Sequence, residues 1–160
     1  MLEIERKYLT KSAEYREHAI SRIHVAQGFL STDPERVVRI RIMGDMANLT
    51  IKGLTNESGT TRFEWERDIP IAEARELLKL CKGPLMEKYR YNVPVGKHLY
   101  EVDEFLGANE GLVVAEIELG SENETFTKPA WLGREVTGEM KYYNTQLSTN
   151  PYSTWKEKKH

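Results

Sequence analysis

Apolar and charged residues alternate along the first ten residues, MLEIERKYLT. The even positions from 2 to 8 are mainly apolar, whereas Glu3, Glu5 and Lys7 occupy the odd positions. Successive side chains of a β-strand point to opposite faces, so the pattern predicts a strand with one apolar and one charged face. For this strand taken alone, a solvated charged face is the simplest interpretation.

The same alternation recurs along the chain and makes strands the dominant predicted element. The predicted strands span residues 1–9, 22–30, 35–43, 47–53, 60–69, 86–93, 97–106 and 111–119. Turn signals such as Gly44-Asp45 and the 56–59 stretch NESG join several of them, and short connections favour antiparallel pairing. About eight antiparallel strands can close into a barrel that holds side chains or one small ligand.

Three helical segments interrupt the strands. The first is predicted over residues 11–20 with Thr10 as its N-cap, and the last opens at Pro129 and runs to about residue 147. The middle helix, 70–81, begins at Pro70 and ends before Gly83-Pro84. The predicted fold class is therefore α+β, mainly antiparallel β, built as an eight-stranded closed barrel with flanking helices.

Charges within the predicted strands are grouped by sign. The basic group contains Arg39, Arg41 and Lys52, and the acidic groups are Glu101 with Asp103 and Glu116 with Glu118. A solvated sheet face would more often mix signs across neighbouring strands. Periodicity leaves two alternatives open: an apolar interior with a charged exterior, or a charged lumen whose apolar outer faces are covered by helices or a partner.

Composition narrows the class of protein. The 160 residues fit one domain, which we place at residues 1–150, followed by a charged tail at 151–160. The chain has 23 Lys plus Arg and 25 Asp plus Glu, a balance that argues against nucleic-acid binding through bulk positive charge. A single cysteine, Cys81, excludes an internal disulfide and a cysteine-based zinc site. With no secretory pattern and no long apolar run, we expect a cytoplasmic protein without membrane contacts.

A charged lumen would have definite chemical consequences. Buried charges are costly unless they are paired or coordinated. Guanidinium groups bind phosphoryl oxygens in a bidentate manner, and carboxylates hold divalent cations that bridge phosphate oxygens. A polyphosphate carrying a divalent cation would satisfy both groups of charge.

Several motifs appear together in a fixed order. They are Glu3-x-Glu5-x-Lys7, Arg39-x-Arg41, Lys52-Gly53, Arg62-x-Glu64-x-Glu66, Lys88-x-Arg90, Glu101-x-Asp103, Glu116-x-Glu118 and the stretch WLGREVTGEMKYYN at 131–144. In type and order they resemble the triphosphate tunnel metalloenzymes, the CYTH superfamily, over essentially the whole chain. The resemblance implies an eight-stranded tunnel whose polar faces point inward.

The resemblance also implies a role for each matching residue. The implied metal ligands, for Mg²⁺ or Mn²⁺, are Glu3, Glu5 and Glu118, with Glu116 and Asp103 nearby. The implied triphosphate contacts are Lys7, Arg39, Arg41, Lys52, Lys88 and Arg90, together with Arg134 and Lys141 from the C-terminal region. The implied catalytic residues are Lys7, Glu5 and Glu118. Glu64, Glu66 and Glu101 have two open roles, binding of a second metal or pairing with a lumen cation, and structural pairing is the favoured one.

One position departs from the family pattern. Some members carry a tyrosine in a QGYL motif of the second strand and pair it with the lysine of the first motif. Here the motif reads Gln27-Gly28-Phe29-Leu30, and Phe29 has no hydroxyl to move a proton or to bind phosphate. Water activation would then depend on the metal and the carboxylates.

The expected function is metal-dependent hydrolysis of a triphosphate, with inorganic triphosphate as the first candidate because the chain has no obvious base-reading insert. Alternatives within the family are a class IV adenylyl cyclase and a thiamine or nucleoside triphosphatase. An alternative of another class is a non-catalytic module that binds polyphosphate. The expected partner is a small triphosphate or polyphosphate, and pairing into a homodimer stays open.

Overall fold

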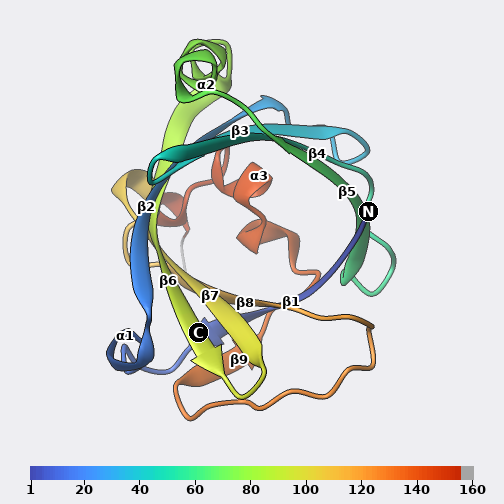
Figure 1. Ribbon diagram of the computed structural model, residues 1–160, viewed down its shortest axis with the longest axis vertical. Helices are drawn as coiled ribbons and strands as arrows, with labels where there is room; N and C mark the ends of the chain where they lie inside the picture. Colours follow the sequence, from blue (N-terminus) through green and yellow to red (C-terminus); the bar gives the residue numbers. More distant parts are fainter. Residues whose placement is uncertain (156–160) are drawn as a thin grey trace.

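The computed structural model describes residues 1–155, and within them nine strands form one antiparallel sheet. The strands are β1 (Leu2–Thr10), β2 (Ser21–Ser31), β3 (Val37–Met43), β4 (Met46–Lys52), β5 (Thr61–Asp68), β6 (Lys82–Val95), β7 (His98–Phe105), β8 (Val113–Glu118) and β9 (Leu132–Glu135). Their order is β5-β4-β3-β2-β6-β7-β8-β1-β9. Pairing of β5 with β1, where Leu2 faces Phe63, closes eight strands into the barrel of Figure 1.

The strand register turns the charged faces inward. Glu5 lies opposite Glu118, and Lys7 lies opposite Glu116. Residues paired across antiparallel strands point to the same side of the sheet, so these four side chains share one face. That face lines a cavity inside the barrel. The charged-lumen alternative is therefore confirmed.

Apolar side chains cover two sectors of the outer wall. Helix α1 (Tyr15–His18) places Tyr15 beside Trp131, and both pack on the outer faces of β6, β7 and β8 around residues such as Val102 and Ile117. Helix α2 (Ile71–Leu78) covers another sector, where its buried residue Ala74 packs with apolar residues of β3 and β4. These contacts let the barrel keep its polar residues inside.

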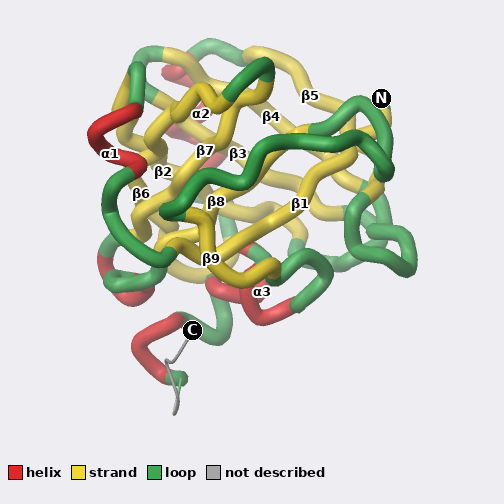
Figure 2. The backbone as a smooth tube through the Cα atoms, turned by 90° about the horizontal axis from the view of Figure 1, so that it is seen from below, coloured by secondary structure: helices red, strands yellow, loops and turns green. Residues whose placement is uncertain are grey.

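The C-terminal segment closes one end of the barrel. Helix α3 (Asn144–Leu147) appears within the ring of strands in Figure 1 and at one end of the barrel in Figure 2. Its buried residue Leu147 packs with Tyr142 and Leu112. Gly59 and Gly138 bring the β4–β5 loop against this segment so closely that a Cβ built on Gly59 would lie 2.4 Å from the Gly138 Cα.

The C-terminal region is where the sequence prediction was wrong. Residues 129–147 do not form one helical region, because residues 132–135 pair with β1 as β9 and only the 3-10 turn Met140–Tyr142 and α3 are helical. The segment 11–20 contains only the short α1, and α2 ends at Leu78 rather than at residue 81.

The predicted tail at 151–160 lies only partly within the described residues, since 156–160 fall outside them. Tyr152, just past the predicted boundary at residue 150, packs against the core. In the described part of the chain, no helix is both long and apolar enough to cross a membrane.

Candidate functional site

The lumen contains a cavity of about 240 Å³ that is lined by charged side chains from most of the strands. Ten of the predicted site residues line it: Glu3, Glu5, Lys7, Arg39, Arg41, Lys52, Lys88, Arg90, Glu116 and Glu118. Glu64, Glu66 and Glu101 line it as well. The lumen-facing positions of the alternating strands thus lie together in the barrel, although some are more than 100 positions apart in the sequence.

Carboxylates dominate the wall formed by β1 and β8. The Lys7 Nζ lies 3.3 Å from Glu5 Oε1 and 3.4 Å from Glu116 Oε2, so one ammonium group serves two carboxylates. Burial, together with the negative charge of Glu116, raises the pKa of Glu5 to about 8. Burial also raises the pKa of Glu118, which lies opposite Glu5. The ionised forms of Glu5 and Glu118 are therefore disfavoured in this wall unless positive charge is added.

Lys52 pairs with two acidic residues beside this wall, Glu3 of β1 and Glu64 of the neighbouring strand β5. Its Nζ lies 3.0 Å from Glu3 Oε1 and 3.5 Å from Glu64 Oε2. Burial would raise the pKa of Glu3, but the charge of Lys52 outweighs it and leaves that pKa below its ordinary value. Glu64 has the opposite outcome, because burial and the neighbouring Glu3 raise its pKa to about 7. Here too a single cation faces two carboxylates.

Arginines dominate the facing wall on β3. The Arg39 Nη2 donates a hydrogen bond to Thr50 Oγ1 at 3.1 Å, and Glu66 lies 3.6 Å from Arg39 and 3.8 Å from Arg41. Burial lowers the pKa of both arginines, and the charge of Arg39 adds to the effect on Arg41, whose pKa falls to about 10. The buried Nε of each arginine has no hydrogen-bond partner among the described residues. Two guanidinium groups thus share one partly exposed carboxylate.

Lys88 and Arg90 share the buried carboxylate of Asp103. Arg90 donates two hydrogen bonds to the Asp103 carboxylate, at 2.8 and 2.9 Å, and the Lys88 Nζ lies 2.7 Å from the same group. Burial would raise the pKa of Asp103, but Arg90 and Lys88 hold it below its ordinary value. Asp103 lies beneath the two cations and does not line the cavity, so in this arrangement it orients them.

The C-terminal segment contributes residues that sequence reasoning missed. Asn144 of α3 accepts hydrogen bonds through its Oδ1 from Gln27 Nε2 at 2.6 Å and from Lys88 Nζ at 2.9 Å. Tyr143 and Asn144 both line the cavity, and the Lys7 Nζ lies 5.6 Å from the centre of the Tyr143 ring. The 131–144 motif includes both residues, but only the closed end of the barrel shows that they enter the lumen.

Arg62 is a further cavity residue to which the sequence assigned no role. Its Nε donates a hydrogen bond to the backbone oxygen of Gly53 at 3.0 Å, and the residue lines the cavity. It shares a face with Glu64 and Glu66, so the strand alternation did contain the signal.

Two predicted triphosphate contacts lie apart from the cavity lining. Arg134 is about half exposed, and its guanidinium binds Glu139 at 2.7 Å and the Tyr142 hydroxyl at 3.3 Å. The Lys141 Nζ lies 4.5 Å from the centre of the Trp155 ring. The structure therefore does not bring either residue to the other cations.

Phe29 occupies the predicted position in the lumen. Its side chain is 3% exposed and lines the cavity in which Lys7 lies. The aromatic ring adds no donor or acceptor there.

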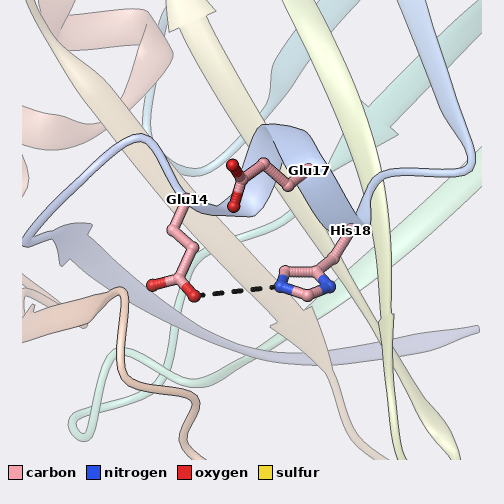
Figure 3. A group of neighbouring side chains, drawn as sticks. All are labelled: Glu14, Glu17 and His18. Atoms are coloured by element: carbon pink, nitrogen blue, oxygen red, sulfur yellow. Dashed lines mark ion pairs between the residues drawn. The ribbon is translucent and has the colours of Figure 1, made fainter.

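The lumen carboxylates fit a divalent cation by their chemistry. Mg²⁺ and Mn²⁺ prefer oxygen ligands, and because burial raises the pKa values of Glu5 and Glu118, an added cation would favour their ionised forms. Among the described residues, the group of three or more ligand-type side chains whose ligand atoms all lie within 4.8 Å of one another is Glu14, Glu17 and His18 at α1 (Figure 3). That group is exposed on the outer surface, where acidic clusters are common without a metal.

Comparison with known proteins agrees with this geometry. The CYTH domain model matches residues 1–150. An inorganic triphosphatase of Acetivibrio thermocellus is 46% identical over 156 residues, covering 97% of this chain and 98% of the relative. An inorganic triphosphatase of Nitrosomonas europaea is 33% identical, covering 92% of this chain and 97% of the relative. The crystal structure of an inorganic triphosphatase superposes with a TM-score of 0.65 at 30% identity, over 91% of this chain and 93% of that one. The chain belongs to the CYTH domain family.

Proposed function

We propose that this protein hydrolyses inorganic triphosphate in the barrel lumen with the help of a divalent metal ion. The observation that carries the proposal is the unbalanced charge of the two facing walls. Arg39 and Arg41 keep buried donors without partners, while Glu5 and Glu118 have raised pKa values. A triphosphate with a bound cation would supply the missing charge to both walls. The two curated relatives, both named inorganic triphosphatases, support this choice of substrate.

Glu3, Glu5, Glu116 and Glu118 are the residues that would hold the metal. When bound there, a divalent cation lowers the pKa of a coordinated water and neutralises charge on the phosphoryl oxygens. Lys7 lies between Glu5 and Glu116, so it can orient both carboxylates and bind a phosphoryl oxygen from the same position. Glu5, Lys7 and Glu118 are accordingly our proposed catalytic residues.

The basic wall would hold and position the triphosphate. Arg39 and Arg41 offer guanidinium donors to phosphoryl oxygens, and Lys52 adds a point charge beside the acidic wall. Phosphoryl transfer depends mainly on such positioning and charge neutralisation. Arg90 and Lys88 would bind the triphosphate in orientations that Asp103 fixes. We therefore assign Asp103 a positioning role rather than metal binding.

Other parts of the assignment stay predictions. Arg134 and Lys141 would bind triphosphate only after a rearrangement of the C-terminal segment that carries them to the lumen. A cytoplasmic location and the choice between Mg²⁺ and Mn²⁺ are likewise predictions from the sequence.

One assay tests the proposal directly. The protein is incubated with Mg²⁺ or Mn²⁺ and, separately, with inorganic triphosphate, ATP or thiamine triphosphate, and phosphate, pyrophosphate and cyclic AMP are measured. We expect phosphate release from inorganic triphosphate well above that from the other two, and none after chelation of the metal. Pyrophosphate with cyclic AMP from ATP would indicate a cyclase instead. Binding of triphosphate without turnover would indicate a binding module.

A matched pair of variants guards against a contaminating phosphatase. Glu118→Gln should remove the activity, while Glu87→Gln should keep it, because Glu87 is exposed outside the cavity and pairs with His24. Equal activity in both variants would contradict the proposed site.

A further inference from the structure

One sector of the outer barrel wall carries apolar side chains that nothing in the described chain covers. Leu2 is 70% exposed, Phe63 45% and Ile51 36%, and Trp65 is partly exposed. Leu2 pairs with Phe63 across β1 and β5, and Ile51 pairs with Trp65 across β4 and β5. Because paired residues and residues two apart share a face, the four side chains form one continuous surface, which we call the uncovered face.

The rest of the outer wall is organised differently. Helix α2 lies over β3 and β4, and α1 with Trp131 lies over β6 to β8. In Figure 1 no helix of the described chain lies outside β5 and the N-terminal end of β1. A barrel with polar residues inside must bury its outer apolar residues against something else. The uncovered face is the sector for which this chain supplies no cover.

We propose that two copies of this chain pair through the uncovered face, with a two-fold axis passing near Phe63. β5 is bonded to β4 along residues 64–68 and to β1 along residues 61–63, so the edge left open on β5 is only residues 65–68, which is short for a further strand. What the face can accept is another sheet face packed against it. A second copy offers a surface of the same size and shape, which is the requirement of a self-complementary two-fold interface.

The exposed apolar area of the uncovered face is close to what pairing with a second copy of this chain requires. With large side chains of roughly 150–250 Å² each, its exposed fractions amount to on the order of 300 Å² of apolar surface. A standard interface removes about 800 Å² from each partner, of which somewhat more than half is apolar. The uncovered face thus supplies the larger part of the apolar surface that one partner needs.

The surroundings of the face suit an interface as well. The Arg67 guanidinium lies 4.6 Å from the centre of the Trp65 ring and forms a polar rim at one side. The strands beneath are fixed by backbone hydrogen bonds, including that from the Glu64 N–H to the Met1 oxygen at 2.9 Å. A rigid apolar centre with a polar rim loses little conformational entropy on pairing.

The test is the mass of the full chain in solution, measured by light scattering and sedimentation from low-micromolar to near-millimolar concentration. We expect the wild type to have twice the mass of one chain. Phe63→Glu and Leu2→Glu should each weaken pairing by about 100-fold or more, because a carboxylate would be buried without a partner at the centre of the interface. Circular dichroism establishes that each variant is folded, and two positions are used so that the test survives if one variant does not fold.

The control is Leu99→Glu, which changes a leucine that is 42% exposed on β7, away from the uncovered face. It should leave the mass at that of the dimer. A wild type that stays monomeric over the whole range would overturn the proposal, and so would a dimer that persists in both folded variants. Triphosphatase activity is measured separately, so its failure would leave this result intact.

Discussion

The two charged walls of the lumen differ in the sign of the charge that each would favour from a ligand. On β1 and β8, burial raises the pKa values of Glu5 and Glu118, and neighbouring carboxylates add to the effect. On β3, burial lowers the pKa values of Arg39 and Arg41, and neighbouring guanidinium groups add to the effect. One wall therefore favours added positive charge, and the other favours added negative charge.

The facing walls do not neutralise each other, although they lie in one barrel. The Asp103 cluster shows that this chain can pair a buried carboxylate fully, since Arg90 and Lys88 together bind both of its oxygens. Incomplete pairing elsewhere falls in the part of the lumen that we propose binds the ligand. It costs stability in the free protein, and binding of a cation together with triphosphate would recover that cost.

The largest effect should follow a change on the acidic wall. Glu118→Gln keeps the shape of the side chain but removes a proposed metal ligand, and we expect kcat to fall about 1000-fold. Because the pKa of Glu118 is raised in the fold, its ionised form destabilises the metal-free protein above the ordinary carboxyl pKa. The amide should therefore leave the melting temperature at neutral pH unchanged or higher. Unchanged turnover would reject the ligand assignment.

Asp103→Asn should have the next largest effect, and the quantity it changes is the stability of the folded protein. The change leaves Arg90 and Lys88 without their buried counter-charge, which should lower the free energy of unfolding by about 3 kcal/mol. Because the Asp103 pKa is lowered, its contribution is present above the ordinary value of 3.8 and is lost as the pH falls through the folded-state pKa. Urea unfolding at neutral and acid pH measures both effects. A variant as stable as the wild type at neutral pH would contradict the positioning role.

The sequence predicted the parts of this site that follow from strand alternation. Glu3, Glu5 and Lys7 repeat with a period of two, so their common face could be predicted before the barrel was seen. The direction of that face could not, because alternation is the same whether the charges point inward or outward. The family resemblance implied that the face points inward, and the cavity that Glu3, Glu5 and Lys7 line confirms it.

The C-terminal region was harder to predict because its contacts are long-range. Residues 132–135 have no strong strand pattern of their own and become β9 by pairing with β1. Asn144 reaches Lys88 only because α3 enters the end of the barrel, a contact between residues 56 positions apart. Local pattern carries no information on such a contact, whereas it does fix the periodicity of β1 and β8.

A change on the basic wall should have a moderate effect. Arg41→Gln removes one of two guanidinium groups that share Glu66, and Arg39 stays to bind triphosphate. We expect KM for triphosphate to rise about 10- to 30-fold with a smaller change in kcat, as loss of one charge-assisted contact predicts. Steady-state kinetics at saturating metal measure this split. A fall in kcat at constant KM would move Arg41 from substrate binding to stabilisation of the transition state.

The smallest expected effect concerns Phe29, which lies in the same cavity as Lys7 but has no polar group. Phe29→Tyr adds one hydroxyl at a position that is only 3% exposed. If a hydroxyl there binds a phosphoryl oxygen or a water, kcat should rise about threefold, and Phe29→Leu, the apolar control, should not reproduce the gain. An unchanged rate in Phe29→Tyr would show that turnover depends on the acidic wall and its metal alone. The contrast between the two walls would then suffice to explain catalysis without a tyrosine at this position.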